Sequence, residues 1–368
     1  MIMTFFLTFL WTAFCVFWLV PIDRSFARKR GIVDAPQEAP TRKIHTNPTP
    51  LLGGVAIYLS VTAVLAVTAV ATDHLLGGYL LGKHVIGVLL GGAVLMVGGV
   101  WDDTMRLSPL KQILWPLLAV AIVIASGIGV NYISNPFGDA IRLDTVQWTI
   151  FQIGDVPYHI TLWADLFTAA WLLGMIYTTK FLDGLDGLAT GVTSIGALIL
   201  FVLSLLPEVG QPETALMAWV LFSACLAFLF FNFHPASIFL GEGGSTFLGF
   251  MLGILAIISG GKIATALLIL GIPILDVAWV ILRRVVQRTS PFWADRKHLH
   301  YRLLDAGFSH RQTVLTLYVL TAVFGASSLV LQKEQKVLAL GIAVVVMGLL
   351  AGWVIWHYRH RGLTGSQK

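Results

Sequence analysis

Six acidic residues lie at or near the ends of long apolar segments: Asp102, Asp103, Asp183, Asp186, Glu242 and Asp276. Two like charges about 4 Å apart repel by about 4 kcal/mol at an effective dielectric of 20, so converging carboxylates need cations or protons. Oxygen ligands without thiolates favour Mg²⁺ or Mn²⁺, which commonly bridge one or two carboxylates to substrate phosphates. If these acids lie close together in the folded protein, the pattern indicates a site for metal-assisted phosphoryl transfer.

A simpler interpretation exists for each acid taken singly. An aspartate in the first turn of a helix favours the helix dipole and can cap the helix. Capping does not explain the adjacent acids in WDDTMRLSP or the spaced pair in KFLDGLDGLATG. The run GEGGST, with Gly243 and Ser245, adds backbone N–H groups at a helix start, which can bind phosphate.

The segments that must position these acids are unusually apolar. Of the 368 residues, 57% are hydrophobic and 12% are charged, against about 25% charged in an ordinary soluble domain. Stretches of about 17–25 apolar residues can cross a bilayer as helices. We therefore expect a single all-α polytopic membrane domain, residues 1–368, with 10–11 transmembrane helices, the segments being about 2–20, 51–70, 85–100, 112–130, 162–179, 188–206, 214–232, 245–258, 263–281, 313–331 and 337–356.

Basic residues predict the orientation of these helices. Most of the 24 Lys and Arg residues fall in alternate loops and the C-terminal tail, so the positive-inside rule places the N-terminus outside and the C-terminus in the cytoplasm. The net charge of +5 then reflects cytoplasmic loops and implies no nucleic-acid partner. The outer loop 131–160 alternates like a β-hairpin. We therefore expect the acids on the cytoplasmic side, in or next to the loops 21–50, 101–111, 180–187, 233–244 and 282–312.

Six motifs occur in an order that resembles a known family: DAPQEAPTRKIHTNPTPLLGG, WDDTMRLSP, FLDGLDGLATG, FNFHPASIFLGEGGSTFLG, PILDVAWVILRR and SPFWADRKHLHYRLLDAGFSHRQTV. The chain resembles, over about residues 20–312, the polyprenyl-phosphate N-acetylhexosamine-1-phosphate transferases. The resemblance implies an enzyme of the cytoplasmic (inner) membrane that has a cytoplasm-facing catalytic cleft and uses Mg²⁺ or Mn²⁺. Its substrates would be a UDP-N-acetylhexosamine and a polyprenyl phosphate such as undecaprenyl phosphate, and its products UMP and a polyprenyl-diphosphate sugar that initiates a cell-envelope glycopolymer.

The resemblance also implies roles for individual residues. Asp102 and Asp103 match a pair that activates the lipid phosphate, and Asp183 and Asp186 match a pair implicated in nucleotide binding and catalysis. Glu242 stands where the family usually has a metal-ligating Asp, and Asp183 is expected to share the metal. The residues expected to bind substrate are Lys43, Lys180, Gly243, Ser245, Asp276, Arg296, His298 and His300.

Three positions depart from the family pattern. Lys180 replaces the usual Asn, Glu242 replaces an Asp, and Tyr301 replaces a second consecutive His. An ammonium cannot ligate a metal, although it can replace part of the charge of the metal or contact a phosphate. A zinc site at His298 and His300 is not favoured, because no Cys or third His is spaced to complete four ligands.

Several alternatives stay open. The final loop, DRKHLHYRLLDAGFSHRQ, is similar to the GlcNAc-1-phosphate branch, which favours UDP-GlcNAc over another UDP-HexNAc or over the phospho-N-acetylmuramoyl-pentapeptide transferase reaction. A non-catalytic relative is a further alternative. A secondary transporter is a distant one, because no inverted halves are seen and the acids lie at helix ends. The residues do not determine the oligomeric state, and a homodimer is among the options.

Overall fold

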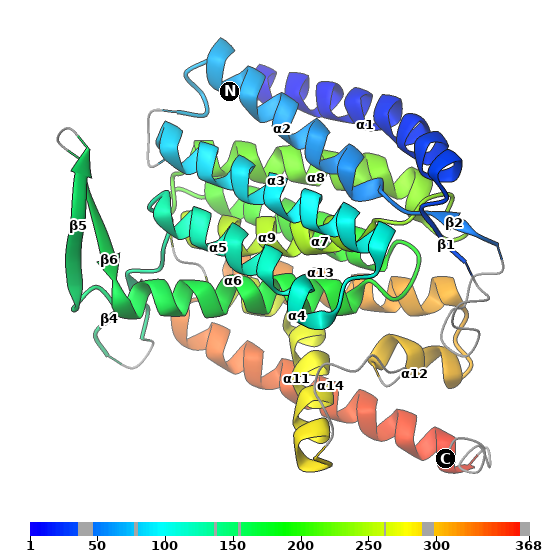
Figure 1. Cartoon of the computed structure of the whole chain (residues 1–368). Helices are drawn as coiled ribbons and strands as arrows, with labels where there is room; N and C mark the ends of the chain where they lie inside the picture. Colours follow the sequence, from blue (N-terminus) through cyan, green and yellow to red (C-terminus); the bar gives the residue numbers. More distant parts are fainter. Residues whose placement is uncertain are drawn as a thin grey trace.

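The computed structural model describes residues 1–35, 47–76, 80–135, 138–153, 156–260, 263–288 and 298–360. Its long helices run side by side in one bundle (Figure 1). They are α1 (Ile2–Arg30), α2 (Gly53–Ala71), α3 (Gly82–Met105), α5 (Leu114–Ala125), α6 (Leu162–Leu182), α7 (Leu188–Leu205), α8 (Pro212–Asn232), α9 (Gly241–Ile258), α13 (His310–Val330) and α14 (Lys333–His360). The remaining helices are α4 (Pro109–Gln112), α10 (Ile263–Ile269), α11 (Gly271–Val286) and α12 (Leu299–Asp305).

The helices confirm the predicted all-α polytopic class. Among the described residues, eight helices are long and apolar enough to cross a bilayer: α1, α2, α3, α7, α8, α9, α13 and α14. Helices α10 and α11 meet at a bend of 80° and make a ninth span if they are counted together. The expected segments 112–130 and 162–179 are also largely helical, as α5 and α6, but they are not among those eight.

Helices extend into several ranges that hydropathy predicts as loops. Helix α1 continues to Arg30, α3 to Met105 and α6 to Leu182. As a result, the two adjacent aspartates of α3 and Lys180 of α6 lie on last helical turns, where the regular backbone fixes the direction of each side chain.

Short strands mark the two ends of the bundle. β5 (Gln147–Ile153) and β6 (Val156–Thr161) form the predicted hairpin, while β1 (Val33–Asp34) pairs with β2 (Thr49–Pro50) and β3 (Tyr132–Ile133) with β4 (Ile141–Arg142), all antiparallel. The β5–β6 hairpin stands at one end of the bundle, and β1, β2 and α12 lie at the other (Figure 1). We call these the hairpin end and the β1–β2 end.

Helix α9 forms the centre of the bundle. In its apolar window 89% of the residues are buried inside the protein, against 22% for α1 and 17% for α14. Glycines make this possible: a Cβ on Gly99 of α3 would lie 2.1 Å from the backbone N of Gly243, and one on Gly54 of α2 would lie 2.2 Å from Cα of Gly244. The backbones of α2 and α3 therefore contact the first turn of α9 directly.

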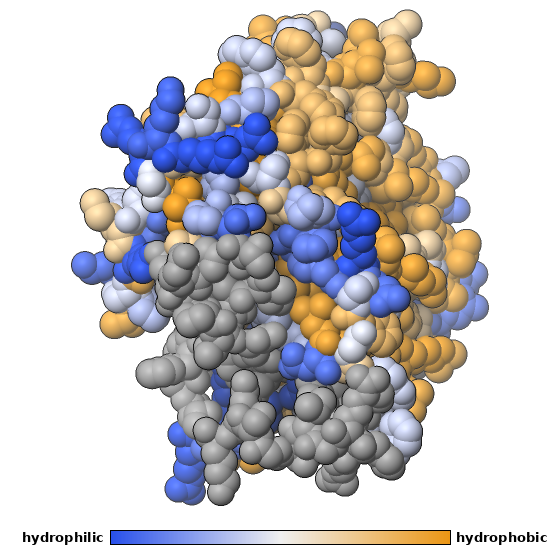
Figure 2. Space-filling view, turned by 90° about the vertical axis from the view of Figure 1, so that its right-hand side faces the viewer, coloured by the Kyte–Doolittle hydropathy of each residue, from blue (hydrophilic) through white to orange (hydrophobic). Residues whose placement is uncertain are grey.

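The outer surface of the bundle is apolar, as a lipid-facing surface requires. Large side chains such as Val70 (91% exposed), Val330 (81%) and Phe230 (77%) point outward. Figure 2 looks onto the β1–β2 end, where hydrophilic residues gather, while hydrophobic residues cover the flank beside it. An exposed apolar surface of this extent on a bundle of apolar helices indicates burial in a membrane.

Candidate active site

Asp102 is held in place by the turn that follows α3. Its Oδ1 accepts a hydrogen bond from the backbone N of Leu107 at 2.7 Å, and the side-chain Nε2 of Gln112 donates to both carboxylate oxygens at 3.0 and 3.1 Å. Leu107 and Gln112 belong to the connection that contains α4. Asp102 therefore has a fixed orientation before any substrate binds.

Asp103 caps the start of α9. Both of its oxygens accept from the backbone N of Glu242 at 3.1 Å. The contact needs a glycine beside it, because Gly241 has φ 73° and a Cβ there would lie 2.5 Å from Asp103 Oδ2. The capping interpretation considered for single acids thus describes Asp103, which joins the end of α3 to the start of α9.

Glu242 and Lys180 form an ion pair across this junction. The ammonium of Lys180 contacts Glu242 Oε1 and also donates to Gln112 Oε1 at 3.2 Å. Both charged side chains are mostly covered, at 18% and 22% exposure. Through Gln112 the pair is connected to Asp102, so residues from α3, α4, α6 and α9 form one polar network beside a narrow pocket that Tyr177 also lines.

Asp183 follows α6 directly and adds a further carboxylate to this region. Burial, and secondarily the negative charges of Glu242 and Asp186, raise the pKa of Asp183 to about 7. In this network the ammonium of Lys180 lies against Glu242. An all-oxygen donor set suits a hard divalent cation such as Mg²⁺, and Glu242 and Asp183 are the residues that would hold it.

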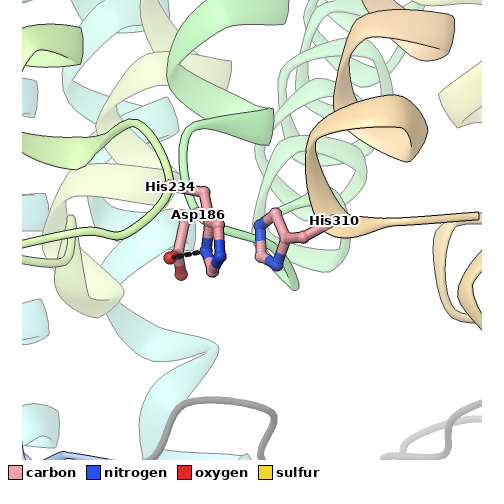
Figure 3. A group of neighbouring side chains, drawn as sticks. All are labelled: Asp186, His234 and His310. Carbon is pink, nitrogen blue, oxygen red and sulfur yellow. Dashed lines mark hydrogen bonds and ion pairs between the residues drawn. The ribbon is translucent and has the colours of Figure 1, made fainter.

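Asp186 lies in a separate group with two histidines (Figure 3). Its Oδ2 contacts His234 Nδ1 at 2.7 Å and accepts from the backbone N of Ala236 at 3.1 Å. The ring of His310 stacks on that of His234, with centroids 4.0 Å apart. The two aspartates of the DGLDG motif therefore have different surroundings. Asp183 is buried and close enough to Glu242 to interact with it electrostatically, while Asp186 joins the turn before α7 to the loop after α8.

Asp276 and the HLH loop form a third group. Asp276 Oδ2 contacts His298 Nδ1 at 2.8 Å, and Oδ1 accepts from the backbone N of Leu299 at 2.8 Å, so Asp276 both orients the imidazole and caps α12. Phe181 stacks on His298 from the side of α6. The structure thus brings together Asp276 and His298, which are 22 residues apart in the sequence.

His300 lies buried against the DGLDG turn. A Cβ on Gly184 would lie 2.3 Å from His300 Nε2, so only glycine at 184 leaves room for this ring. Burial, with smaller effects from His298 and His310, lowers the pKa of His300 to about 3. The imidazole is therefore neutral near pH 7, and its Nε2 makes no hydrogen bond within the described chain.

Two residues expected to cradle phosphate lie within α9. Gly243 packs against the backbone of Gly99, and the hydroxyl of Ser245 donates back to the carbonyls of Gly241 and Glu242 at 3.2 Å. Gly243 and Ser245 are both buried, so in this structure their contacts are helix packing and helix backbone. Lys43 and Arg296, also expected to bind substrate, lie outside the described residues.

Sequence reasoning missed four residues that the geometry brings into the site: Gln112, Gly184, His234 and His310. Gln112 lies ten residues after Asp102 with nothing in the sequence to connect them. The two histidines are part of motifs that could be recognised, FNFHPAS and GFSHRQ. Their wide separation along the chain concealed that the rings stack.

The fold and these sites define a class of protein: a polytopic helical membrane protein with a carboxylate-rich site at one end of its bundle. Residues 85–260 match the sequence model of glycosyl transferase family 4, a range that includes Asp102, Lys180 and Glu242. Together with the relatives below, this match shows that the chain belongs to that family.

The curated relatives cover most of the chain. A "Probable undecaprenyl-phosphate N-acetylglucosaminyl 1-phosphate transferase" of Bacillus subtilis is 30% identical over 335 residues, covering 89% of this chain and 85% of the relative. A "Decaprenyl-phosphate N-acetylglucosaminephosphotransferase" of Mycolicibacterium smegmatis is 32% identical over 351 residues, covering 88% and 82%. An "Undecaprenyl-phosphate alpha-N-acetylglucosaminyl 1-phosphate transferase" of Yersinia pestis is 27% identical over 315 residues, covering 82% and 77%.

Proposed function

We propose that this chain transfers N-acetylglucosamine 1-phosphate from UDP-N-acetylglucosamine to a polyprenyl phosphate in the membrane. The observation that carries the proposal is the network of Asp102, Gln112, Lys180 and Glu242, which lies at the ends of the apolar helices α3 and α6 and at the start of α9. A lipid phosphate reaches such a position with its chain in the bilayer. The printed names of the relatives, which describe this reaction, support the same substrates.

The reaction exchanges one phosphoanhydride bond for another. An oxygen of the polyprenyl phosphate attacks the phosphorus that bears the sugar, and a new P–O–P linkage forms. The bond between that phosphorus and the bridging oxygen of the UMP portion breaks, and its electron pair leaves with UMP. Phosphoryl transfer of this kind depends on positioning and on charge stabilisation more than on covalent help from the protein.

Asp102 is our candidate for orienting the attacking phosphate and taking its remaining proton. A phosphate monoester has a second pKa of about 6, so only a minority of molecules carry that proton near pH 7. The hydrogen bonds from Leu107 N and Gln112 Nε2 hold the Asp102 carboxylate in one direction. Asp103 supports it indirectly, because it caps α9 and thereby fixes the distance between α3 and Glu242.

Lys180, Glu242 and Asp183 are assigned to the charge of the donor diphosphate. Mg²⁺ or Mn²⁺, when held by Glu242 and Asp183, supplies neutralisation of that diphosphate. Lys180 is already paired with Glu242, so its ammonium lies within reach of the same phosphates and can contribute charge from the protein side.

Asp276, His298 and His300 are assigned to the sugar nucleotide. Asp276 orients the ring of His298 through its contact with Nδ1, which leaves Nε2 of that ring to contact the substrate. His300 is held neutral by burial and rests on the DGLDG turn. Imidazoles held in fixed orientations suit recognition of the hydroxyl and amide groups of a sugar.

A panel of donors tests the proposal. Purified protein with Mg²⁺ and undecaprenyl phosphate is supplied with UDP-GlcNAc, a second UDP-HexNAc and UDP-MurNAc-pentapeptide, and UMP release is measured. We expect the highest turnover with UDP-GlcNAc. A preference for the pentapeptide donor would assign the chain to the muramoyl branch, and uptake of intact UDP-sugar into proteoliposomes without UMP would favour a transporter.

The orientation is part of the proposal. We place the β1–β2 end and the C-terminus in the cytoplasm, where UDP-sugars are available, and the hairpin end outside. The basic residues at the end of α1, Arg28, Lys29 and Arg30, support this assignment because they lie at the β1–β2 end.

A further inference from the structure

Asp186, His234 and His310 come together from three separate connections. Asp186 lies in the turn between α6 and α7, His234 follows α8, and His310 is the first residue of α13 (Figure 3). One potential ligand atom from each lies within 4.8 Å of the other two. The proposed transferase reaction assigns no task to either histidine, so the cluster needs its own explanation.

The hydrogen bonds within the cluster do not provide a partner for every polar atom. His234 Nδ1 contacts Asp186 Oδ2 at 2.7 Å. Neither ring nitrogen of His310 is exposed to solvent, and neither makes a well-formed hydrogen bond within the described chain, although the ring lies close to the backbone of Asp186. Buried polar atoms without partners are rare in folded proteins and often mark a missing ion or water.

The donor set has a clear metal preference. Two imidazole nitrogens and one carboxylate oxygen are the ligands of zinc and related transition metals, and Mg²⁺ prefers oxygen alone. Three such ligands leave one tetrahedral position for water or a phosphate oxygen. The Mg²⁺ donor set described above, Glu242 and Asp183, contains no imidazole and is therefore chemically distinct.

The cluster must contract to bind such an ion. Zinc holds His nitrogen and carboxylate oxygen at about 2.0–2.2 Å, so tetrahedral ligand atoms lie roughly 3.3 Å apart. The imidazoles now stack at an interplanar angle of 15°, and one of them must turn for both nitrogens to face one point. His310 is the ring that can turn without breaking a well-formed hydrogen bond within the part of the chain that the structure describes, although it must give up its stacking on His234.

The surrounding charges permit a cation here. Arg311 lies beside the cluster, and its guanidinium is directed to the carbonyl oxygen of His234, to which it donates at 3.1 and 3.3 Å. The N-terminus of α13 adds a small positive potential. Two acidic residues oppose these positive charges. Asp186 belongs to the cluster, and Asp183 is close enough to interact with Asp186 electrostatically.

We propose that Asp186, His234 and His310 form a second metal site, which binds Zn²⁺ or a similar transition-metal ion and is separate from the Mg²⁺ site of the transferase. An ion there joins the turn before α7, the loop after α8 and the start of α13. It also occupies Asp186. If the proposed function is correct, Zn²⁺ consequently inhibits transfer, because Asp186 belongs to the DGLDG pair expected to act in nucleotide binding.

Binding is tested without substrates, so that it stands apart from the proposed activity. Tag-free full-length protein in detergent is titrated with Co²⁺ in excess Mg²⁺, and the visible absorption of tetrahedral Co²⁺ is followed, with Zn²⁺ as competitor. We expect one Co²⁺ per chain, displaced by Zn²⁺. His310→Gln and His234→Ala should each weaken Zn²⁺ binding by at least about 100-fold, since even the loss of a supporting residue costs 10–100-fold.

The controls separate loss of binding from loss of folding. His159→Ala alters an exposed histidine of β6 and should leave Co²⁺ binding unchanged. His310→Gln removes a ring without well-formed hydrogen bonds in the described chain, so this variant should fold even if His234→Ala does not. Absence of a tetrahedral Co²⁺ spectrum, or a spectrum that both cluster variants retain, would overturn the proposal.

A second measurement tests the consequence. UMP release by each protein is compared with and without micromolar Zn²⁺ at constant Mg²⁺, each variant against its own zinc-free rate. Inhibition should be present in the unaltered chain and in His159→Ala, and reduced in His310→Gln. If Zn²⁺ binds but does not inhibit, the metal site stands and its proposed effect on transfer is wrong. If Zn²⁺ inhibits His310→Gln as strongly as the unaltered chain, the inhibition arises at another site.

Discussion

At the scale of single residues, the pairing of Glu242 with Lys180 explains two departures from the family pattern together. A longer acid at 242 reaches an ammonium at 180, where the family usually has an Asp and an Asn. Two substitutions that contact one another are expected to be energetically coupled. The ammonium also favours the ionised form of Glu242 at a mostly covered position, and a metal ligand must be ionised.

The coupling predicts the behaviour of three variants. Glu242→Gln should abolish Mg²⁺-dependent UMP release, because it removes a charged ligand and leaves Lys180 without its counter-ion. Glu242→Asp alone should weaken turnover, and the double variant Glu242→Asp with Lys180→Asn should recover a good part of it. Glu208→Gln, at an exposed position between α7 and α8, is the matched control. Near-normal metal dependence in Glu242→Gln would show that Glu242 is not a ligand.

Asp102 is the residue that we expect to act as the base. Asp102→Asn should lower turnover by roughly 100-fold or more, the usual contribution of a positioned acid or base. Binding of the UDP-sugar should be nearly intact, because the asparagine oxygen can still accept from Leu107 N and preserve the turn. Turnover and donor affinity are measured for this variant and for Asp139→Asn, at an exposed position between β3 and β4. Unchanged turnover would exclude Asp102 as the base.

Individual site residues could be predicted from the sequence only where they belong to a contiguous motif. The acids of WDD, DGLDG and GEGGS could be selected because each motif is short and unusual for a membrane segment. The partners of those acids could not be selected, since Gln112, His234 and His310 reach them through tertiary packing. Nor could the sequence show that Asp103 caps α9 while Asp102 contacts Gln112, because adjacent helical side chains point about 100° apart.

At the scale of elements, glycines determine how α9 fits between α2 and α3. Hydropathy sufficed to predict the membrane segments and alternation sufficed for the hairpin, since both patterns are local. Hydropathy places the ends of α3 and α6 too early, because polar residues after an apolar stretch resemble a loop. In the structure those polar residues extend the helices and contribute to the site.

The close approach of α3 and α9 predicts a sharp difference between two glycine substitutions. Gly99→Ala places a Cβ 2.1 Å from Gly243 N, so α3 and α9 must move apart. The free energy of unfolding should fall by about 1–3 kcal/mol, and activity should be lost. Gly174→Ala in α6 meets no atom within 4 Å and should change stability by less than about 1 kcal/mol. Thermal unfolding in detergent compares the two. Equal midpoints would show that α3 and α9 do not pack through Gly99.

At the scale of the whole molecule, the two ends of the bundle differ in chemistry. The ends of α3, α6 and α8 and the starts of α9 and α13, which carry most residues of the three groups, lie on the side of β1 and β2, and the β5–β6 hairpin carries none of them within the described chain (Figure 1). Such polarity fits an enzyme that takes a soluble donor from one side of the membrane and leaves its product in the lipid.

The proposed orientation is testable by labelling. In a background with Cys15→Ala and Cys225→Ala, a membrane-impermeant thiol reagent applied to intact cells should label Asp139→Cys, between β3 and β4, and should label Ser108→Cys, before α4, only after lysis. Both positions are exposed. A protein with Cys15→Ala and Cys225→Ala alone gives the background. Labelling of Ser108→Cys in intact cells with Asp139→Cys protected would reverse the orientation.

The burial of α9 has a consequence for how the chain is made. The helices that pack most extensively against it, α2, α3, α6 and α7, all precede it in the sequence, so a ribosome delivers α9 after most of the helices that will cover it have been synthesised. Its glycines and Glu242, which would be costly against lipid tails, can pass from the translocon into protein. Because α9 is synthesised after these helices, the site is incomplete until α9 has been inserted. Nascent chains that end before residue 241 lack Glu242 and therefore cannot form its contact with Asp103.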